Sequence, residues 1–167
     1  FKKENYKNVI ANYENYLKTE KGNYEVYYNL AYAYYKSADY PNSAKYFKLA
    51  IDFEPSNSSL IYLYALTEYY NKQYDNSLNL LLKAEQSGKD DFWLFYYLAR
   101  IYYDVKLDYT NSIKYFERTL KFDLTNEMKK KIYENLIVAL FNKNDSTKLI
   151  DYSDKLLELE KTNFYGL

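Results

Sequence analysis

Apolar residues recur along this chain at the three- and four-residue spacing of an α-helix. Leu30, Ala31 and Tyr34 share one helical face, and the same Leu-Ala-x-x-Tyr pattern returns 68 residues later, at 98–102. Residues three or four apart lie on one side of a helix, so this period indicates amphipathic helices rather than strands. The pattern predicts an all-α fold of about nine helices, at residues 5–18, 24–36, 40–53, 58–71, 74–86, 91–104, 109–122, 126–142 and 146–160.

A short phrase, Tyr-x-Asn followed by serine or valine, occurs four times at a nearly fixed interval. Successive phrases are 34, 34 and 35 residues apart and begin at Tyr6, Tyr40, Tyr74 and Tyr109. Asn5, Asp39 and Asp108 precede three of them, and such side chains cap helices by accepting from a free backbone N–H. Pro41 suits a first helical turn, where its missing N–H does no harm. Each phrase therefore begins a helix, and the chain is an internal repeat.

Small residues recur where the paired helices of each unit are expected to touch. Ala31, Ser43 and Ala50 occupy such positions in the unit that contains Pro41. Small side chains let two helices approach to about 8–10 Å, and bulky ones would force them apart. The neighbouring aromatic residues are expected to fill the space beside this seam.

These units resemble the tetratricopeptide repeat (TPR), whose pattern combines Leu-Gly/Ala, tyrosine, a small residue, an aromatic residue, alanine and proline. The best copy places Tyr27, Leu30, Ala31, Tyr34, Tyr40, Ser43, Phe47, Ala50 and Pro55 at the pattern's positions. Later copies depart from it: Glu68 replaces a tyrosine, Thr119 replaces an alanine, and one extra residue precedes Tyr109. The resemblance implies a right-handed superhelical α-solenoid of antiparallel helix hairpins, with a concave groove lined by the first helix of each hairpin.

The repeat phases predict one domain over residues 1–167. Its units are a half repeat at 1–22, then 23–56, 57–90, 91–125 and a divergent hairpin at 126–161. The chain begins inside a second helix, and residues 163–167 resemble the start of another first helix, so we expect a fragment of a longer protein. Uncapped repeats expose apolar surface, which predicts self-association through the ends.

Composition excludes several classes of chemistry. The chain has no cysteine and no histidine, which removes thiolate sites and the commonest general base and metal ligand. The acidic pairs are not typical of a catalytic site: Asp90-Asp91 is typical of a helix start, and Glu158–Glu160 is typical of a solvated helix face. No phosphate-binding loop is present. We therefore predict no enzyme activity, no cofactor and no metal site.

Charge and hydropathy narrow the classes of partner that this chain is expected to bind. Twenty-three basic residues balance 23 acidic ones, which disfavours nucleic acid, including the mode of related 35-residue repeats that read RNA. No apolar run approaches the roughly 18 residues that span a bilayer, so no direct membrane insertion by this segment is expected. The compartment stays open between the cytoplasm and a periplasmic or membrane-associated place reached through a missing N-terminal segment.

The 25 tyrosines are the strongest indication of function. Tyrosine offers a large ring, little rotamer entropy to lose and a hydroxyl, which suits protein interfaces. We expect a protein–protein interaction scaffold that binds a partner peptide or helix in the groove. The predicted groove residues are Tyr28, Tyr32, Tyr35, Tyr62, Leu66, Tyr69, Tyr96, Arg100 and Tyr103, with Glu25 beside them.

Two alternatives to a protein partner stay open for this groove, and the role of Arg100 is open as well. The tyrosines could stack on a small ligand or a glycan, or follow from an A+T-rich genome and bind nothing. Arg100 could meet an acidic group of a partner or pair with Asp104 four residues on. Tyr28 and Tyr32 stand where some TPR proteins clamp a C-terminal carboxylate with Lys and Asn, so that activity is not supported.

Overall fold

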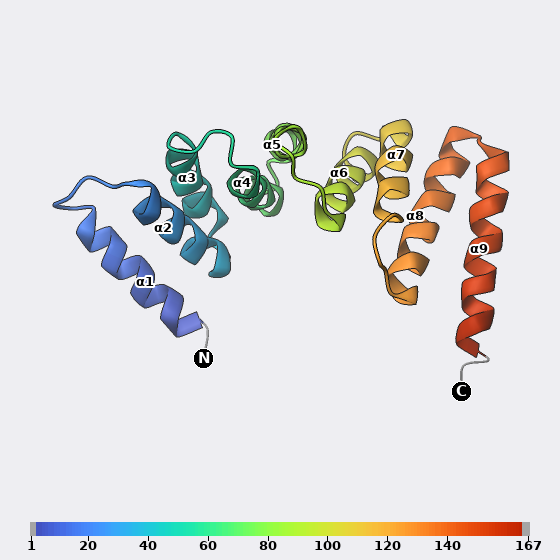
Figure 1. The fold of residues 1–167 in the computed structure, drawn as a ribbon, viewed down its shortest axis with the longest axis horizontal. Coiled ribbons are helices and arrows are strands. Elements are labelled where there is room, and N and C mark those ends of the chain that lie inside the picture. The colour runs from blue at the N-terminus through green and yellow to red at the C-terminus, as the bar shows by residue number, and fades with distance from the viewer. Residues whose placement is uncertain (1–2, 165–167) are drawn as a thin grey trace. The chain divides into compact units, whose positions relative to one another are not determined.

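A computed structural model describes the backbone of residues 3–164 and the side chains of residues 5–161 (Figure 1). Within this range the chain forms nine α-helices and no strand, which confirms an all-α solenoid of antiparallel hairpins. The helices are α1 (Lys3–Tyr16), α2 (Tyr24–Lys36), α3 (Tyr40–Ile51), α4 (Ser58–Tyr70), α5 (Tyr74–Gln86), α6 (Phe92–Asp104), α7 (Tyr109–Thr119), α8 (Asn126–Lys143) and α9 (Ser146–Phe164).

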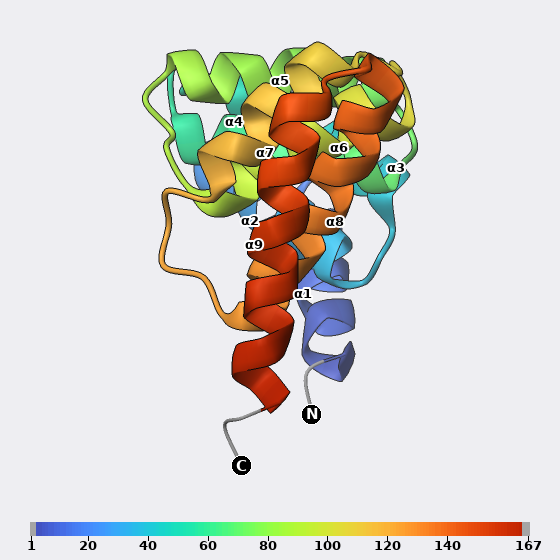
Figure 2. The same cartoon turned by 90° about the vertical axis from the view of Figure 1, so that its right-hand side faces the viewer.

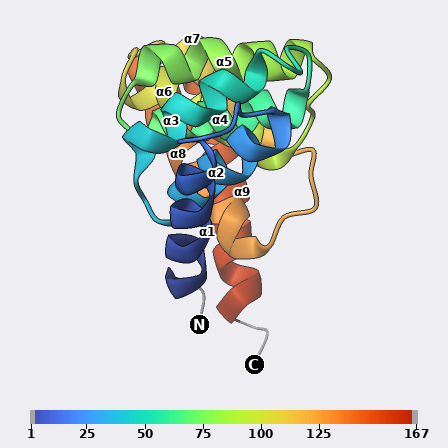
Figure 3. The ribbon, with the colours of Figure 1, turned by 90° about the vertical axis from the view of Figure 1, so that its left-hand side faces the viewer.

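The chain divides into two compact units, one ending at Lys89 and the other beginning at Asp90. In the first unit α1 packs on α2 (Figure 3), followed by the hairpins α2/α3 and α4/α5. The second unit holds the hairpins α6/α7 and α8/α9, and Figure 2 shows α9 beside α8. The division falls within one residue of the predicted repeat boundary at 90, while the single domain over 1–167 stays a prediction.

Helix starts follow the predicted caps in two places and differ in a third. The Asp39 carboxylate accepts from the backbone N–H of Asn42 at 3.2 Å, and Asp108 accepts from Asn111 at 3.0 Å. The cap predicted at Asn5 is wrong, because α1 already begins at Lys3 and Asn5 lies inside it.

Helix ends differ from the predicted ones by a few residues. The last turn of α7 ends at Thr119 instead of residue 122, because the backbone N–H groups of 120–122 bond three residues back rather than four. Such tighter bonds are common at helix ends. Of the residues 163–167 that resemble the start of another first helix, Asn163 and Phe164 belong to α9, and residues 165–167 lie outside the described part.

The turn inside each hairpin uses one residue in the left-handed region. Ala38, Lys72 and Leu107 have φ of 61°, 62° and 52°. In the first two turns the next backbone N–H bonds to the carbonyl five residues back, which closes the helix end. In the third turn the bond spans six residues, from Asp108 to Tyr102, because of the extra residue before Tyr109.

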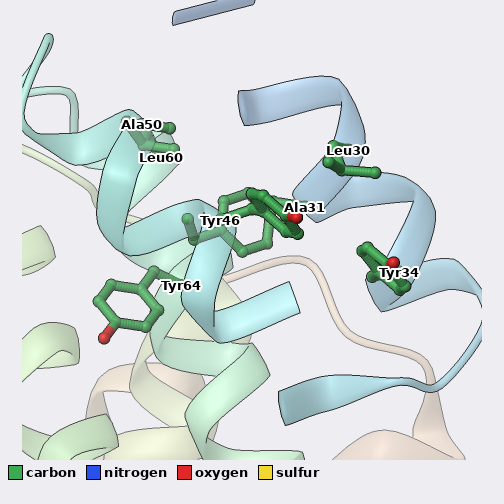
Figure 4. Packing of buried hydrophobic residues seen from close by; sticks show 8 residues of the cluster. Leu30, Ala31, Tyr34, Tyr46, Ala50, Leu60 and Tyr64 are labelled. Atoms are coloured by element: carbon green, nitrogen blue, oxygen red, sulfur yellow. The ribbon is translucent and has the colours of Figure 1, made fainter. Parts of the chain in front are cut away.

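The core of the first unit lies at the helix contacts that the small residues predict. Ala31, Phe47 and Ala50 are fully buried, together with Leu30 from α2 and Leu60 from α4. Figure 4 shows side chains from these three consecutive helices gathered in one cluster. Fully buried alanines at the helix contacts confirm the reason given for small residues there.

In the first two hairpins a buried serine at the start of the second helix ties the two helices together. The Ser43 hydroxyl donates to the Ala31 carbonyl at 2.9 Å, and Ser77 donates to Ala65 at 2.8 Å. Ser112 holds the same place in the third hairpin, but its buried hydroxyl has no partner within the described residues. Ser112 follows Ala99 by 13 residues instead of 12, so the extra turn residue accounts for the missing bond.

The same substitution should therefore act differently at two equivalent serines. Ser77→Ala is expected to lower the free energy of unfolding by about 1 kcal/mol, because it removes a buried hydrogen bond. Ser112→Ala removes an unpaired buried hydroxyl and is expected to leave stability unchanged or raise it. Urea unfolding followed by circular dichroism measures both, and equal losses would contradict the assignment.

Candidate functional site

The first helix of the first hairpin, α2, carries a ladder of stacked tyrosine rings. Tyr24 stacks on Tyr28 with centroids 5.8 Å apart, and Tyr28 stacks on Tyr32 at 6.3 Å with an interplanar angle of 8°. The Lys36 ammonium lies 5.2 Å from the Tyr32 ring centroid. These residues, the α2 stripe, are four apart in sequence and so follow one side of the helix.

Two of the phenols in the α2 stripe have a raised pKa, and all three rings are partly accessible. Burial, reinforced by the nearby Tyr32, raises the pKa of Tyr28, and burial together with Glu54 raises the pKa of Tyr24. All three rings are half-buried, whereas Glu25 beside them is exposed. A protonated phenol both donates and accepts hydrogen bonds, so the stripe offers apolar ring surface and polar groups together.

The predicted residues on α4 are less uniform. Tyr62 is half-buried and carries the Lys89 ammonium 4.8 Å from its ring centroid. Tyr69 is half-buried and meets the Tyr74 ring edge-on at 5.5 Å. Leu66 is only 8% exposed, so it offers little surface to a partner.

Tyr35 belongs to a cluster at the turn ends of α2, α3 and α4. Its ring lies 6.0 Å from Tyr40 and 6.1 Å from Tyr70, and Tyr40 stacks on Tyr70 at 5.3 Å. Burial, followed by the neighbouring phenols of Tyr70 and Tyr40, raises the pKa of Tyr35 to about 12. Tyr35 therefore serves more in joining hairpins than as open surface.

The first helix of the second unit, α6, repeats the stripe with different chemistry. Phe92 stacks on Tyr96 at 5.8 Å, and Arg100 donates to the Tyr96 hydroxyl at 3.5 Å. Arg100 also forms an ion pair with Asp104 at 2.5 Å. This is the pairing with Asp104 that the sequence offered as an alternative to an acidic group of a partner. Burial alone would lower the pKa of Arg100, but its bonds to Asp104 and Tyr96 raise it.

Tyr103 ends the set of predicted residues. Its half-buried ring meets Tyr109 edge-on at 5.9 Å and Phe116 at 6.3 Å. Burial, followed by the Asp104 carboxylate and the neighbouring Tyr109, raises its pKa. Tyr35 and Tyr103 thus hold equivalent places in their hairpins.

Two aromatic residues beside Tyr96 were missed by the sequence prediction. Phe92 and Trp93 line a cavity with Tyr96, and Trp93 is 53% exposed. Phe92 lies 68 residues after Tyr24, at the same place in the repeat, and Trp93 is the single tryptophan of the chain. The repeat offset could have added Phe92 to the set.

Fold and surface together define an α-solenoid of TPR-like hairpins in which the first helices α2 and α6 carry aromatic stripes. Among solved structures the chain is similar to a crystal structure of MamA protein, at 18% identity and a TM-score of 0.81, over 99% of this chain and 88% of that chain. MamA 41-end from Desulfovibrio magneticus RS-1 is similar at 19% identity and a TM-score of 0.74, over 94% and 86%.

BtubC (BKLC) from P. vanneervenii is also similar, at 13% identity and a TM-score of 0.69, over 96% of this chain and 75% of that chain. At these identities the likeness is one of fold. No protein-family model matches the chain, and no curated protein matches its sequence.

Two further features bear on the chemistry of the described residues. None of their helices has the length and apolar character needed to cross a membrane. They also contain no group of three or more His, Cys, Asp or Glu side chains placed to hold a metal ion.

Proposed function

We propose that this chain is a protein-interaction module whose tyrosine-rich first helices bind a segment of a partner protein. The α2 stripe carries the proposal. Its three half-buried rings and terminal lysine present contact area, hydroxyls and one positive charge along a single helix. Tyrosine loses little rotamer entropy on binding, and stacking fixes these rings further before a partner arrives.

A peptide suits this surface better than a glycan. Sugars stack on open ring faces, but the Tyr28 ring already stacks with its neighbours Tyr24 and Tyr32 on the same side of α2. The Tyr62 ring likewise has the Lys89 ammonium over it. A peptide can use the ring edges and hydroxyls instead, through apolar contacts and hydrogen bonds to its backbone. The proposal assigns no catalytic role and no cofactor.

Peptide selection tests the proposal. Random peptides displayed on phage would be selected on the intact chain, and labelled synthetic copies titrated by fluorescence anisotropy. Tyr28→Ala combined with Tyr32→Ala is expected to weaken a peptide that binds the α2 stripe by tenfold or more, about 1.4 kcal/mol, because binding energy concentrates in few aromatic residues. Tyr16→Ala, an exposed tyrosine on α1, is the control and should change little.

Two results would overturn the proposal. The first is a selection that returns no peptide with saturable binding. The second is saturable binding of cell-wall glycans that is lost in Tyr62→Ala and Tyr96→Ala, which would establish the stacking alternative in place of a protein partner.

A further inference from the structure

The second unit contains a cavity between the first two turns of α6 and those of α8. Its volume is about 200 Å³, and its apolar lining comes from Phe92, Trp93, Tyr96, Met128 and Ile132. Clefts that hold drug-sized ligands measure about 300–1,000 Å³. This cavity is smaller, and its size suits one side chain.

The α6 side of the cavity is a set of rings in fixed mutual orientation. Trp93 meets Phe92 edge-on, with centroids 4.9 Å apart and an interplanar angle of 81°, and meets Tyr96 at 84°. Phe92 and Tyr96 stack on each other at 19°. Each ring restrains the others, yet Trp93 stays more than half exposed. Exposed apolar surface that is gathered around a cavity, as these rings are, is typical of interaction sites and binding grooves.

The α8 side supplies an adaptable apolar surface. Ile132 is almost fully buried, and Met128 is half-buried beside it. A methionine thioether adjusts its shape readily and contacts aromatic rings favourably. The cavity therefore has rigid rings on one side and a soft floor on the other.

Two opposite charges stand at the rim of the cavity. Glu127 and Lys131 are exposed residues one helical turn apart on α8 and both line the cavity. Neither forms an ion pair with any residue in the described part of the chain. Their charges cancel, so the rim favours neither a cation nor an anion inside the cavity. Each remains able to pair with a charge beside the entering group.

We infer that this cavity takes one bulky apolar side chain, aromatic or long aliphatic, from a segment of a partner protein that carries an acidic and a basic residue beside it. The acidic residue pairs with Lys131 and the basic one with Glu127. The inference rests on the proposed function for the nature of the partner, but it concerns different residues from the α2 stripe. An apolar anchor buried in a central pocket is the arrangement that contributes most affinity at interfaces.

The single tryptophan makes the cavity directly observable. Peptides selected on the intact chain would be titrated while Trp93 emission is recorded. Entry of an apolar side chain removes water from the indole, so emission is expected to move to shorter wavelength with saturation. Replacing the peptide's anchor residue by alanine is expected to abolish the shift and weaken binding at least tenfold.

Protein variants locate the effect. Trp93→Ala is expected to weaken binding of the labelled peptide at least tenfold. Met128→Phe fills the cavity while leaving the rings in place, and it is independently expected to weaken binding by the same factor. Phe141→Ala, at a 70% exposed residue of α8 outside the cavity, is the matched control and should leave affinity unchanged. Thermal melts of each variant confirm folding, and Met128→Phe decides the question if Trp93→Ala lowers stability.

The outcomes separate this inference from the proposed function. Peptides that bind with no emission shift and equal affinity for both variants would overturn the cavity site while leaving the interaction module standing. A saturable shift with methyl β-glucoside or tetramethylammonium alone would overturn it in favour of a sugar or cation site. A selection that returns no peptide would overturn both.

Discussion

Phe116→Ala is expected to lower the free energy of unfolding of the second unit by about 3–5 kcal/mol. Phe116 is fully buried in α7, and its ring meets the rings of Tyr96 and Tyr103 edge-on, each at 6.3 Å. Truncation removes its apolar contacts and leaves a cavity between α6 and α7 that the surrounding helices can only partly close. Urea unfolding followed by circular dichroism gives the change directly.

A matched control uses the same substitution at an exposed phenylalanine. Phe141 on α8 is 70% exposed, so Phe141→Ala is expected to change stability by less than about 0.5 kcal/mol. Similar losses in the two variants would mean that Phe116 is not part of a packed core.

Ala31→Trp is expected to lower the free energy of unfolding by about 3 kcal/mol, through overpacking rather than through a cavity. Ala31 is fully buried in the seam of the first unit, and its carbonyl accepts the Ser43 hydroxyl bond. An indole at this place would push α2 and α3 apart and break that bond. A thermal melt should show an earlier midpoint.

Ala11→Trp provides the comparison, because Ala11 lies on the exposed side of α1. The same enlargement there meets no packed helix and should leave the melting temperature nearly unchanged. A harmless Ala31→Trp would show that the helices of the first hairpin are not in close contact at this residue.

The hydrophobic period predicts the helices of this chain well because each hairpin buries one regular stripe. The repeat phrase adds the helix starts, since Asp39 and Asp108 cap where predicted. The end of α7 could not be read from sequence, because a tightened last turn depends on local backbone bonds that leave no mark in the apolar pattern. Asn5 shows the reverse case, in which a good cap residue sits inside a helix.

The sequence predicts which site residues share one side of a single helix, but it does not predict which residues of different helices meet. Tyr28 and Tyr32 follow from the four-residue period of α2, and they lie in a ladder together. Leu66 is buried although its place in the repeat suggested open surface. The cavity beside Trp93 joins residues of α6 to residues of α8 more than 30 positions later, and no local pattern encodes that meeting.

The tyrosine pairs at the hairpin turns also bear on how the chain folds. Tyr35 with Tyr40, and Tyr69 with Tyr74, join rings only five residues apart in sequence across the turn. Contacts of such short range form with little loss of chain entropy and are typical of fast-folding helical proteins. Each of these two turns is therefore stabilised by contacts that form locally, before any long-range pairing is needed.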